Sequence, residues 1–166
     1  KACDTFRGTM DGSDYKDYIT ARTNMAGVNF RKELFPNKIV KEFDLVKSKL
    51  EIIPTAYLLI DGGKETTVQK VSQTKPIEQN NIELAYKTAK AGEYLGKKLI
   101  YLEAGSGAKN HVSFEMIRFI SQNIEIPLIV GGGIRSMKTI QNVYDAGADL
   151  VVIGTAFEND TNFFNI

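Results

Sequence analysis

The chain has 166 residues, of which 43% are hydrophobic and 25% charged, a balance that suits one soluble globular domain with a substantial core. The 21 Lys and Arg residues nearly balance the 20 Asp and Glu residues, and this formal net charge of +1 disfavours a nucleic-acid partner or an anionic membrane surface. One cysteine excludes an internal disulfide and, with one histidine, a zinc cluster, which favours a cytoplasmic location. The longest apolar runs are far below the roughly 18 to 20 residues that span a bilayer, so no membrane span is expected.

The beginning of the chain differs from the remainder. Residues 1–36 are polar, rich in Gly, Asp, Thr and Lys, and contain no apolar run of the kind that follows. We leave this segment unassigned and treat residues 37–166 as one domain. The first residue is Lys rather than Met, which suggests a fragment or a processed piece of a longer protein.

From about residue 50, short apolar runs alternate with Gly-containing loops and helical segments. The apolar runs predict four strands, at residues 50–63, at 98–103, from Pro127 onward, and at 149–154. Between the first strand and the next helix, the stretch TTVQKVS (residues 66–72) is predicted as a small extended or irregular piece. Near-continuous apolar strands that alternate with amphipathic helices indicate parallel strands covered by helices, so the fold class is α/β.

Three helices are predicted between the strands from the spacing of their apolar residues. The first begins at Asn80 or Asn81, ends at Gly96 and has Ile82, Ala85, Tyr86 and Ala89 at helical spacing. The second presents Val112, Met116, Ile117 and Ile120 on one face. The third is capped by Ser136, ends at Gly147 and buries Ile140, Val143 and Tyr144.

Three of the predicted strands end in loops rich in glycine. In parallel α/β proteins ligands bind outside the carboxyl ends of the strands, and in (β/α)8 barrels the last two such loops often bind phosphate through backbone N–H groups. We therefore interpret the loops after the last two strands as a paired phosphate site, formed by Gly131, Gly132 and Gly133 with Gly154 and Thr155. The alternative for the triple glycine alone is that a tight turn needs glycine for its geometry.

The strand at residues 98–103 ends on an acid. Tyr101 and Glu103 are two residues apart and point to the same side of the strand. A carboxylate there needs a polar partner, and a ligand hydroxyl is one, so Glu103 is a candidate for orienting and partly deprotonating a substrate hydroxyl. The alternative is a structural glutamate that is bonded to a neighbouring strand or to loop N–H groups.

Weaker candidates lie near the same loops. His111 is interpreted as a solvent-facing residue at a helix start rather than a base, and Arg135 either neutralises an anion or forms a surface ion pair. Asp61 could bond a loop amide or a ligand. The pair Phe163 and Phe164 is interpreted as packing.

Three stretches together resemble one known family. YLEAGSGA (residues 101–108), PLIVGGGIRS (127–136) and AGADLVVIGTAFE (146–158) are similar to segments of the geranylgeranylglyceryl phosphate synthases and their bacterial heptaprenylglyceryl relatives. The likeness extends from about residue 50 to residue 164 and implies a TIM barrel of the (β/α)8 type. Since such a barrel takes about 250 residues and at least about 200, we expect only its C-terminal four or so βα units here.

The resemblance implies a Mg²⁺-dependent prenyltransferase that joins a polyprenyl diphosphate to sn-glycerol 1-phosphate, forms an ether lipid precursor and releases diphosphate. Tyr101 and Glu103 would be the catalytic residues. The implied sn-glycerol 1-phosphate site comprises Tyr101, Leu102, Glu103, Ala104, Gly105, Ser106, Gly107, Gly132, Gly133, Gly154 and Thr155.

The magnesium site of the family has no match in this sequence. In the family its acidic ligand belongs to the first strand and a hydroxyl partner to the second, and nothing here resembles either. The early acids do not end an apolar strand, so no metal ligand is assigned; they are Asp4, Asp11, Asp14 and Asp17. The alternatives are therefore a catalytically silent truncated remnant that binds glycerol phosphate, or another TIM-barrel enzyme that handles phosphate esters.

Four βα units alone would expose two sheet edges and an apolar face. Such a half barrel could pair with a second copy, be covered by residues 1–36, or be an inactive truncated product. Of these, we expect pairing with a second copy, which gives a homo-oligomer.

Overall fold

The computed structural model describes residues 53–160 and 163–164. The predictions for residues 1–36, for the four early Asp residues and for the start of the first strand at residue 50 lie outside these described residues.

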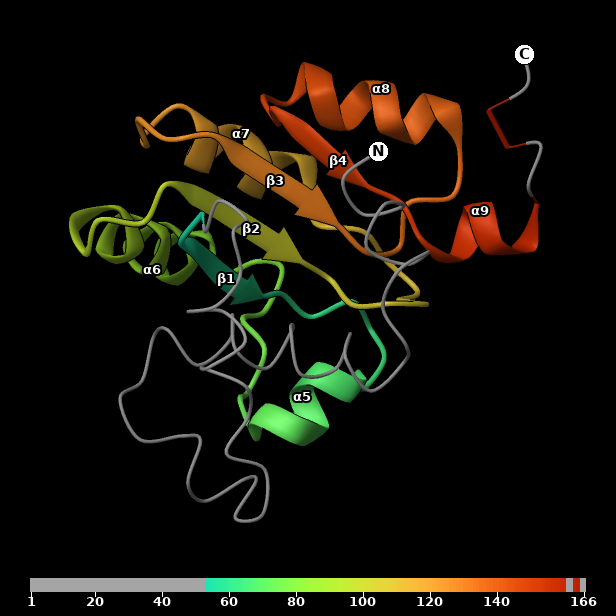
Figure 1. The fold of residues 1–166 in the computed structure, drawn as a ribbon, viewed down its shortest axis with the longest axis horizontal. Coiled ribbons are helices and arrows are strands. Elements are labelled where there is room, and N and C mark those ends of the chain that lie inside the picture. Colours follow the sequence, from blue (N-terminus) through green and yellow to red (C-terminus); the bar gives the residue numbers. More distant parts are fainter. Residues whose placement is uncertain (1–52, 161–162, 165–166) are drawn as a thin grey trace, which may run out of the picture.

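Four parallel strands form one sheet, in the same order as in the chain (Figure 1). The strands are β1 (Thr55–Leu59), β2 (Leu99–Glu103), β3 (Leu128–Gly131) and β4 (Leu150–Val152). Each strand is paired with the next in parallel, and a helix lies between them along the chain. The predicted α/β class with parallel strands is confirmed.

Three amphipathic helices, α6 (Ile82–Tyr94), α7 (Phe114–Ser121) and α8 (Met137–Asp145), pack against one face of this sheet. The core lies between them and consists of alternate strand residues, such as Ile100 and Leu102, together with helix residues such as Ile117 and Val143. Two short helices follow the outer strands of the described sheet: α5 (Thr67–Ser72) comes after β1 and α9 (Thr155–Asn159) after β4. The core therefore holds the strand ends at fixed positions.

Side-chain caps define where the three long helices begin. The side chains of Asn81, Ser113 and Ser136 accept hydrogen bonds from the backbone N–H three residues later, at 3.2, 3.3 and 3.1 Å. Such a bond satisfies one of the N–H groups that a helix start leaves unpaired. The caps predicted at Asn81 and Ser136 are confirmed, and so are the helix ends at Gly96 and Gly147, whose φ angles are +79° and +107°.

The stretch predicted as extended or irregular after β1 is instead the helix α5. Thr66 caps it by accepting a hydrogen bond from Gln69 N at 3.1 Å, and Gln73 ends it in the left-handed conformation with φ of 51°. The β-branched residues of this segment suggested an extended chain, but such propensities are weak, and the Thr66 cap favours a helix start here.

Two details of the predicted helix faces were wrong. Val112 is buried as expected but lies before α7 rather than in it, because Ser113 is the cap. Tyr144 was predicted in the buried stripe of α8, yet it is 42% exposed, whereas Ile140 and Val143 are buried. The apolar stripe of α8 is narrower than the spacing suggested, and Tyr144 lies at its border.

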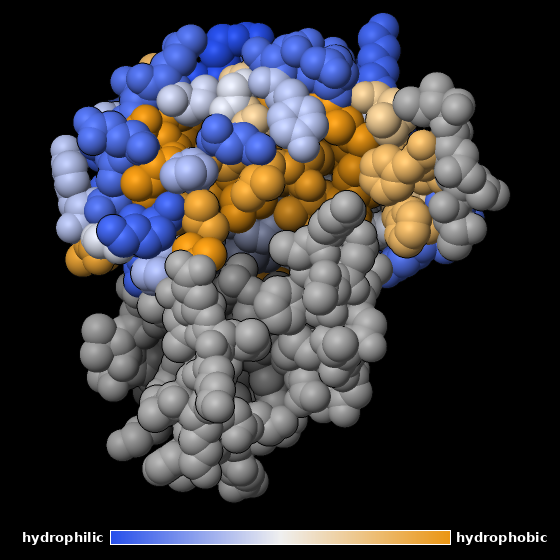
Figure 2. Space-filling model, turned by 45° about the horizontal axis from the view of Figure 1, so that its top comes forward, coloured by the Kyte–Doolittle hydropathy of each residue, from blue (hydrophilic) through white to orange (hydrophobic). Residues whose placement is uncertain are grey.

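The opposite face of the sheet carries a second set of apolar residues. The register places Tyr57, Tyr101, Ile129 and Leu150 in one row across the four strands, and none of them belongs to the core beneath the helices. Tyr57 and Tyr101 stack edge to face with ring centroids 5.1 Å apart, and Leu150, on the outer strand β4, is 50% exposed. Figure 2 shows hydrophobic residues gathered in a continuous area across the middle of this side of the molecule.

Within the described residues, no helix has the length and apolarity that crossing a bilayer requires.

Candidate functional site

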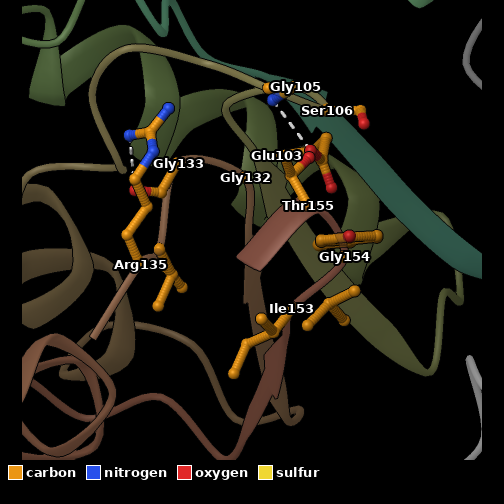
Figure 3. Close-up of a pocket in the computed structure, with 13 residues that line it drawn as sticks. Glu103, Gly105, Ser106, Gly132, Gly133, Arg135, Ile153, Gly154 and Thr155 are labelled. Carbon is orange, nitrogen blue, oxygen red and sulfur yellow. Dashed lines mark hydrogen bonds between the residues drawn. The ribbon is translucent and has the colours of Figure 1, made fainter. Parts of the chain in front are cut away.

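One pocket lies at the carboxyl ends of β2, β3 and β4, where the loops that follow these strands meet (Figure 3). Most of the predicted site residues line it, namely Tyr101, Glu103, Gly105, Ser106, Gly107, Gly132, Gly133, Gly154 and Thr155. These residues come from three separate βα connections, and the parallel sheet brings them together because all its strands end at the same edge.

The acid of the pocket is Glu103, which ends β2 and is only 9% exposed. Its Oε1 accepts a hydrogen bond from Gly105 N at 2.7 Å, and its carboxyl group is also hydrogen-bonded to the side chain of Tyr101. Burial raises the pKa of the Glu103 carboxyl above its ordinary value, and the two hydrogen bonds oppose this rise without cancelling it. The loop N–H partner is the one that the alternative, structural interpretation of Glu103 named. The same carboxyl also lines the pocket, as a candidate base must.

The triple glycine after β3 is dictated by close packing around this acid. A Cβ atom on Gly131 would lie 2.5 Å from the Tyr101 hydroxyl, and one on Gly132 would lie 2.8 Å from Glu103 Oε1. Gly132 and Gly133 also have φ angles of +85° and +70°, which favour glycine. Backbone geometry and close packing therefore require glycine here, and because glycine has no side chain, its backbone is uncovered where it lines the pocket.

The opposite side of the pocket is formed by the loop after β4, with Gly154 and Thr155. Sequence reasoning missed three apolar lining residues, Ile134, Val152 and Ile153. Their signal was present, since Ile134 directly follows the triple glycine and Val152–Ile153 directly precede Gly154. These side chains make part of the pocket wall apolar beside the polar Glu103.

Two predicted site residues do not reach the pocket. Leu102 and Ala104 have no exposed surface, and both side chains belong to the core beneath the helices. The reason is the two-residue period of a strand: because Tyr101 and Glu103 face the pocket, their neighbours face the other way. The structure corrects this part of the predicted set: within residues 101–104, only the side chains of Tyr101 and Glu103 line the pocket.

Arg135 lines the pocket, but its guanidinium is occupied by backbone carbonyls. Nη1 donates to Gly133 O at 3.3 Å (Figure 3). Nη1 also donates to Lys109 O at 3.1 Å, and Nη2 donates to Ala108 O. Within residues 53–160 and 163–164, Arg135 forms no ion pair. These contacts fit neither of the two predicted roles for Arg135, which were anion ligand and surface ion-pair partner.

The remaining candidates are structural. Asp61 Oδ1 accepts from Gly63 N at 2.8 Å, which confirms its predicted bond to a loop amide. His111 is half-buried, with Nδ1 2.7 Å from Val112 O and its ring 4.7 Å from that of Phe114, so it is a packed residue rather than a solvent-facing one. Phe163 and Phe164 pack edge to face at 5.0 Å, as predicted. In the part of the chain that the structure describes, no group of three potential metal ligands is found.

With this geometry established, we compared the chain with known proteins. The model of the PcrB family matches residues 9–165. A geranylgeranylglyceryl phosphate synthase of Flavobacterium johnsoniae is 62% identical over 121 residues, which are 73% of this chain and 50% of that protein. The enzyme of the same name from Thermococcus kodakarensis is 47% identical over 156 residues, or 92% of this chain and 60% of the relative.

Solved structures give the same result. The chain is similar to the crystal structure of (S)-3-O-geranylgeranylglyceryl phosphate synthase from Thermoplasma acidophilum in complex with substrate sn-glycerol-1-phosphate, with a TM-score of 0.69 and 39% identity. That match covers 75% of this chain and 49% of the other, so this chain spans about half the length of such relatives. A second structure, from Thermoplasma volcanium, gives a TM-score of 0.71 at 36% identity over 85% of this chain and 56% of that one. These neighbours confirm the predicted TIM-barrel class, and the chain belongs to the PcrB family.

Proposed function

We propose that this chain takes part in prenyl transfer to sn-glycerol 1-phosphate, in which a polyprenyl diphosphate is the donor and diphosphate is released. One observation carries the proposal: the pocket places a buried carboxyl group, Glu103, beside bare glycine backbone contributed by two neighbouring βα loops. A phosphorylated polyol needs both features. The similarity to the Thermoplasma acidophilum enzyme, whose structure is a complex with sn-glycerol-1-phosphate, supports this substrate.

The phosphate would bind over Gly132, Gly133, Gly154 and Thr155. Glycine lets an anion approach the backbone closely, and backbone N–H groups can donate to its oxygens. With the phosphate there, the glycerol chain would extend across the pocket toward the loop after β2, where Ser106 and Gly107 also line the wall. In this orientation the far hydroxyl of glycerol lies next to Tyr101 and Glu103.

Glu103 would then act as the base. The glycerol oxygen forms a bond to the first carbon of the prenyl chain while the bond from that carbon to the diphosphate oxygen breaks, and its electron pair leaves with diphosphate. The hydroxyl proton passes to the Glu103 carboxylate. A carboxyl with a raised pKa is a stronger base once ionised, which suits this step, and Tyr101 keeps the carboxyl oriented through its hydrogen bond.

The family resemblance also implies Mg²⁺, which would neutralise the departing diphosphate. The described residues do not fit a magnesium site, since they contain no group of three potential ligands, and we assign no step to the metal. Mg²⁺ and the prenyl diphosphate are therefore proposals that rest on the resemblance alone. The cytoplasmic location is a proposal that rests on the cysteine content.

The test is a titration combined with an assay of the purified chain. Binding of sn-glycerol 1-phosphate is measured by calorimetry, with unphosphorylated glycerol as the matched control, and turnover is measured with Mg²⁺ and prenyl diphosphates of several lengths. We expect saturable binding of the phosphate ester and formation of the ether product. Binding without turnover would favour the alternative of a silent chain that only holds glycerol phosphate, and absence of binding would overturn the phosphate site itself.

A further inference from the structure

The contacts of Arg135 are not explained by the proposed reaction. This residue lies two positions after the triple glycine, separated from it by Ile134, at the rim of a pocket proposed to bind an anion, and a direct charge contact would be the simplest expectation. Its guanidinium instead donates to the carbonyls of Ala108, Lys109 and Gly133. Two of these carbonyls lie 26 and 27 residues away in the sequence, in the loop that follows β2.

Arg135 thus connects the two loops between which the ligand must fit. The loop after β2 carries Gly105, Ser106 and Gly107 of the pocket wall, and the loop after β3 carries Gly132 and Gly133. The two loops are in close contact beside Arg135, because a Cβ atom on Gly133 would lie 2.5 Å from Asn110 O. Hydrogen bonds from a charged donor are stronger than neutral ones, so those of Arg135 hold the two loops together.

We propose that Arg135 is a positioning residue, which holds the loop after β2 against the triple glycine so that the phosphate-binding backbone and Glu103 stay at a fixed separation. The inference rests on the proposed function for its ligand, although not for its structural part. The guanidinium suits the task because its planar fork can reach several carbonyls at once, which a lysine ammonium does with less geometric definition.

Two measurements on Arg135→Ala test the role. The first is hydrogen exchange at the amides of Lys109 and Asn110, which donate to Gly62 O at 2.9 and 3.0 Å. We expect these amides to exchange about tenfold faster or more, because the neighbouring carbonyls lose their hydrogen bonds from Arg135. The second is the affinity for sn-glycerol 1-phosphate, which we expect to fall about tenfold, as for the loss of a charge-assisted hydrogen bond.

Arg135→Lys separates positioning from direct charge attraction, since it keeps the charge and loses the fork. Positioning predicts that this variant also weakens ligand binding, by about threefold or more, and speeds exchange at the same amides. A direct charge contact predicts near-normal affinity for Arg135→Lys, together with an affinity of Arg135→Ala that no longer depends on salt. Lys138→Ala is the matched control, because Lys138 is exposed on the next helix and removing it takes away the same charge.

The outcomes distinguish this inference from the proposed function. Faster exchange at Lys109 and Asn110 in a chain that binds no glycerol phosphate would support the positioning role of Arg135 and reject the proposed function. Unchanged exchange in both variants would overturn the inference, whatever the chain binds. If Arg135→Ala does not fold, Arg135→Lys gives the same two readouts and decides alone.

Discussion

At the scale of single residues, Glu103 combines burial with two hydrogen bonds and is the base of the proposed reaction. We expect Glu103→Gln to lower turnover by at least about 100-fold, since a positioned base typically contributes that much or more. Its affinity for sn-glycerol 1-phosphate should stay within about threefold, because the phosphate is expected to bind to glycine backbone elsewhere in the pocket. Single-turnover kinetics and calorimetry check both parts, with Glu115→Gln, an exposed residue of α7, as the control. Unchanged turnover would remove Glu103 from the mechanism.

The raised pKa of Glu103 also has a consequence for stability. The folded protein holds the Glu103 proton more tightly than the unfolded chain does, so the stabilising contribution is complete below the ordinary pKa of 4.5. It is lost as the pH rises through the raised pKa of the folded state. As the pH increases above 4.5, the free energy of unfolding of Glu103→Gln should therefore rise relative to that of the native chain. Thermal unfolding of both proteins at several pH values measures this difference.

Gly132 offers a test of how tightly the pocket is built. It has φ of +85°, and a Cβ atom there would meet Gly105 N at 2.5 Å as well as the Glu103 carboxylate. Gly132→Ala should cost about 2 to 3 kcal/mol in free energy of unfolding, from backbone strain and overpacking together. Gly96 is the matched control, because its φ is +79° but nothing lies within 4 Å of the added Cβ, so Gly96→Ala should cost only about 1 kcal/mol. Urea unfolding compares them, and equal costs would contradict the crowding around Glu103.

The residues of the site could be predicted from the sequence where the rule was local. Tyr101 and Glu103 followed from the two-residue period of a strand, and the glycine loops from the position of ligand sites in parallel sheets. Leu102 and Ala104 were included because the resemblance was carried over as a continuous stretch, although the same period places them in the core. The contacts of Arg135 could not be predicted, since they depend on how two loops 26 or 27 residues apart pack together.

At the scale of elements, the helices that were predicted well are those with a cap and a wide apolar stripe. Ser136 illustrates the contribution of a cap, since its Oγ accepts from Thr139 N at the start of α8. Ser136→Ala should lower the free energy of unfolding by about 1 kcal/mol, or the melting temperature by about 2 to 4 °C. Ser136→Asp should retain nearly all of the stability, because aspartate caps as well as serine. Equal losses in both variants, measured by calorimetry, would show that the side-chain cap is not what stabilises α8.

The helix α5 shows where element prediction fails. Its segment TTVQKVS has β-branched residues and no long apolar stripe, so its composition points to an extended chain. The structural signal was Thr66, three residues before Gln69, in the position of a cap. A helix of 6 residues is too short to be favoured by propensity alone, so a local pattern does not predict it.

At the scale of the whole molecule, the described sheet has a covered face and a face without helices. Among the described residues, the only strand paired with β4 is β3 and the only strand paired with β1 is β2, although Ile77 N donates to Leu59 O at the end of β1 at 2.8 Å. The row Tyr57, Tyr101, Ile129 and Leu150 crosses the face away from the helices and ends in a half-exposed leucine. Apolar faces and unpaired strand edges favour association with another chain, which is the physical basis for expecting a homo-oligomer.

Leu150 is the place to test that expectation. We expect this chain to self-associate, and we expect Leu150→Lys to shift it toward the monomer, because a charge on an outer strand opposes both edge pairing and apolar contact. Leu84→Lys is the control: Leu84 is 46% exposed, close to the 50% of Leu150, but it lies on α6 in the helix layer. Sedimentation velocity over a range of concentrations distinguishes the variants. A monomeric native chain, or an equal effect of both substitutions, would mean that this face is not where copies of the chain meet.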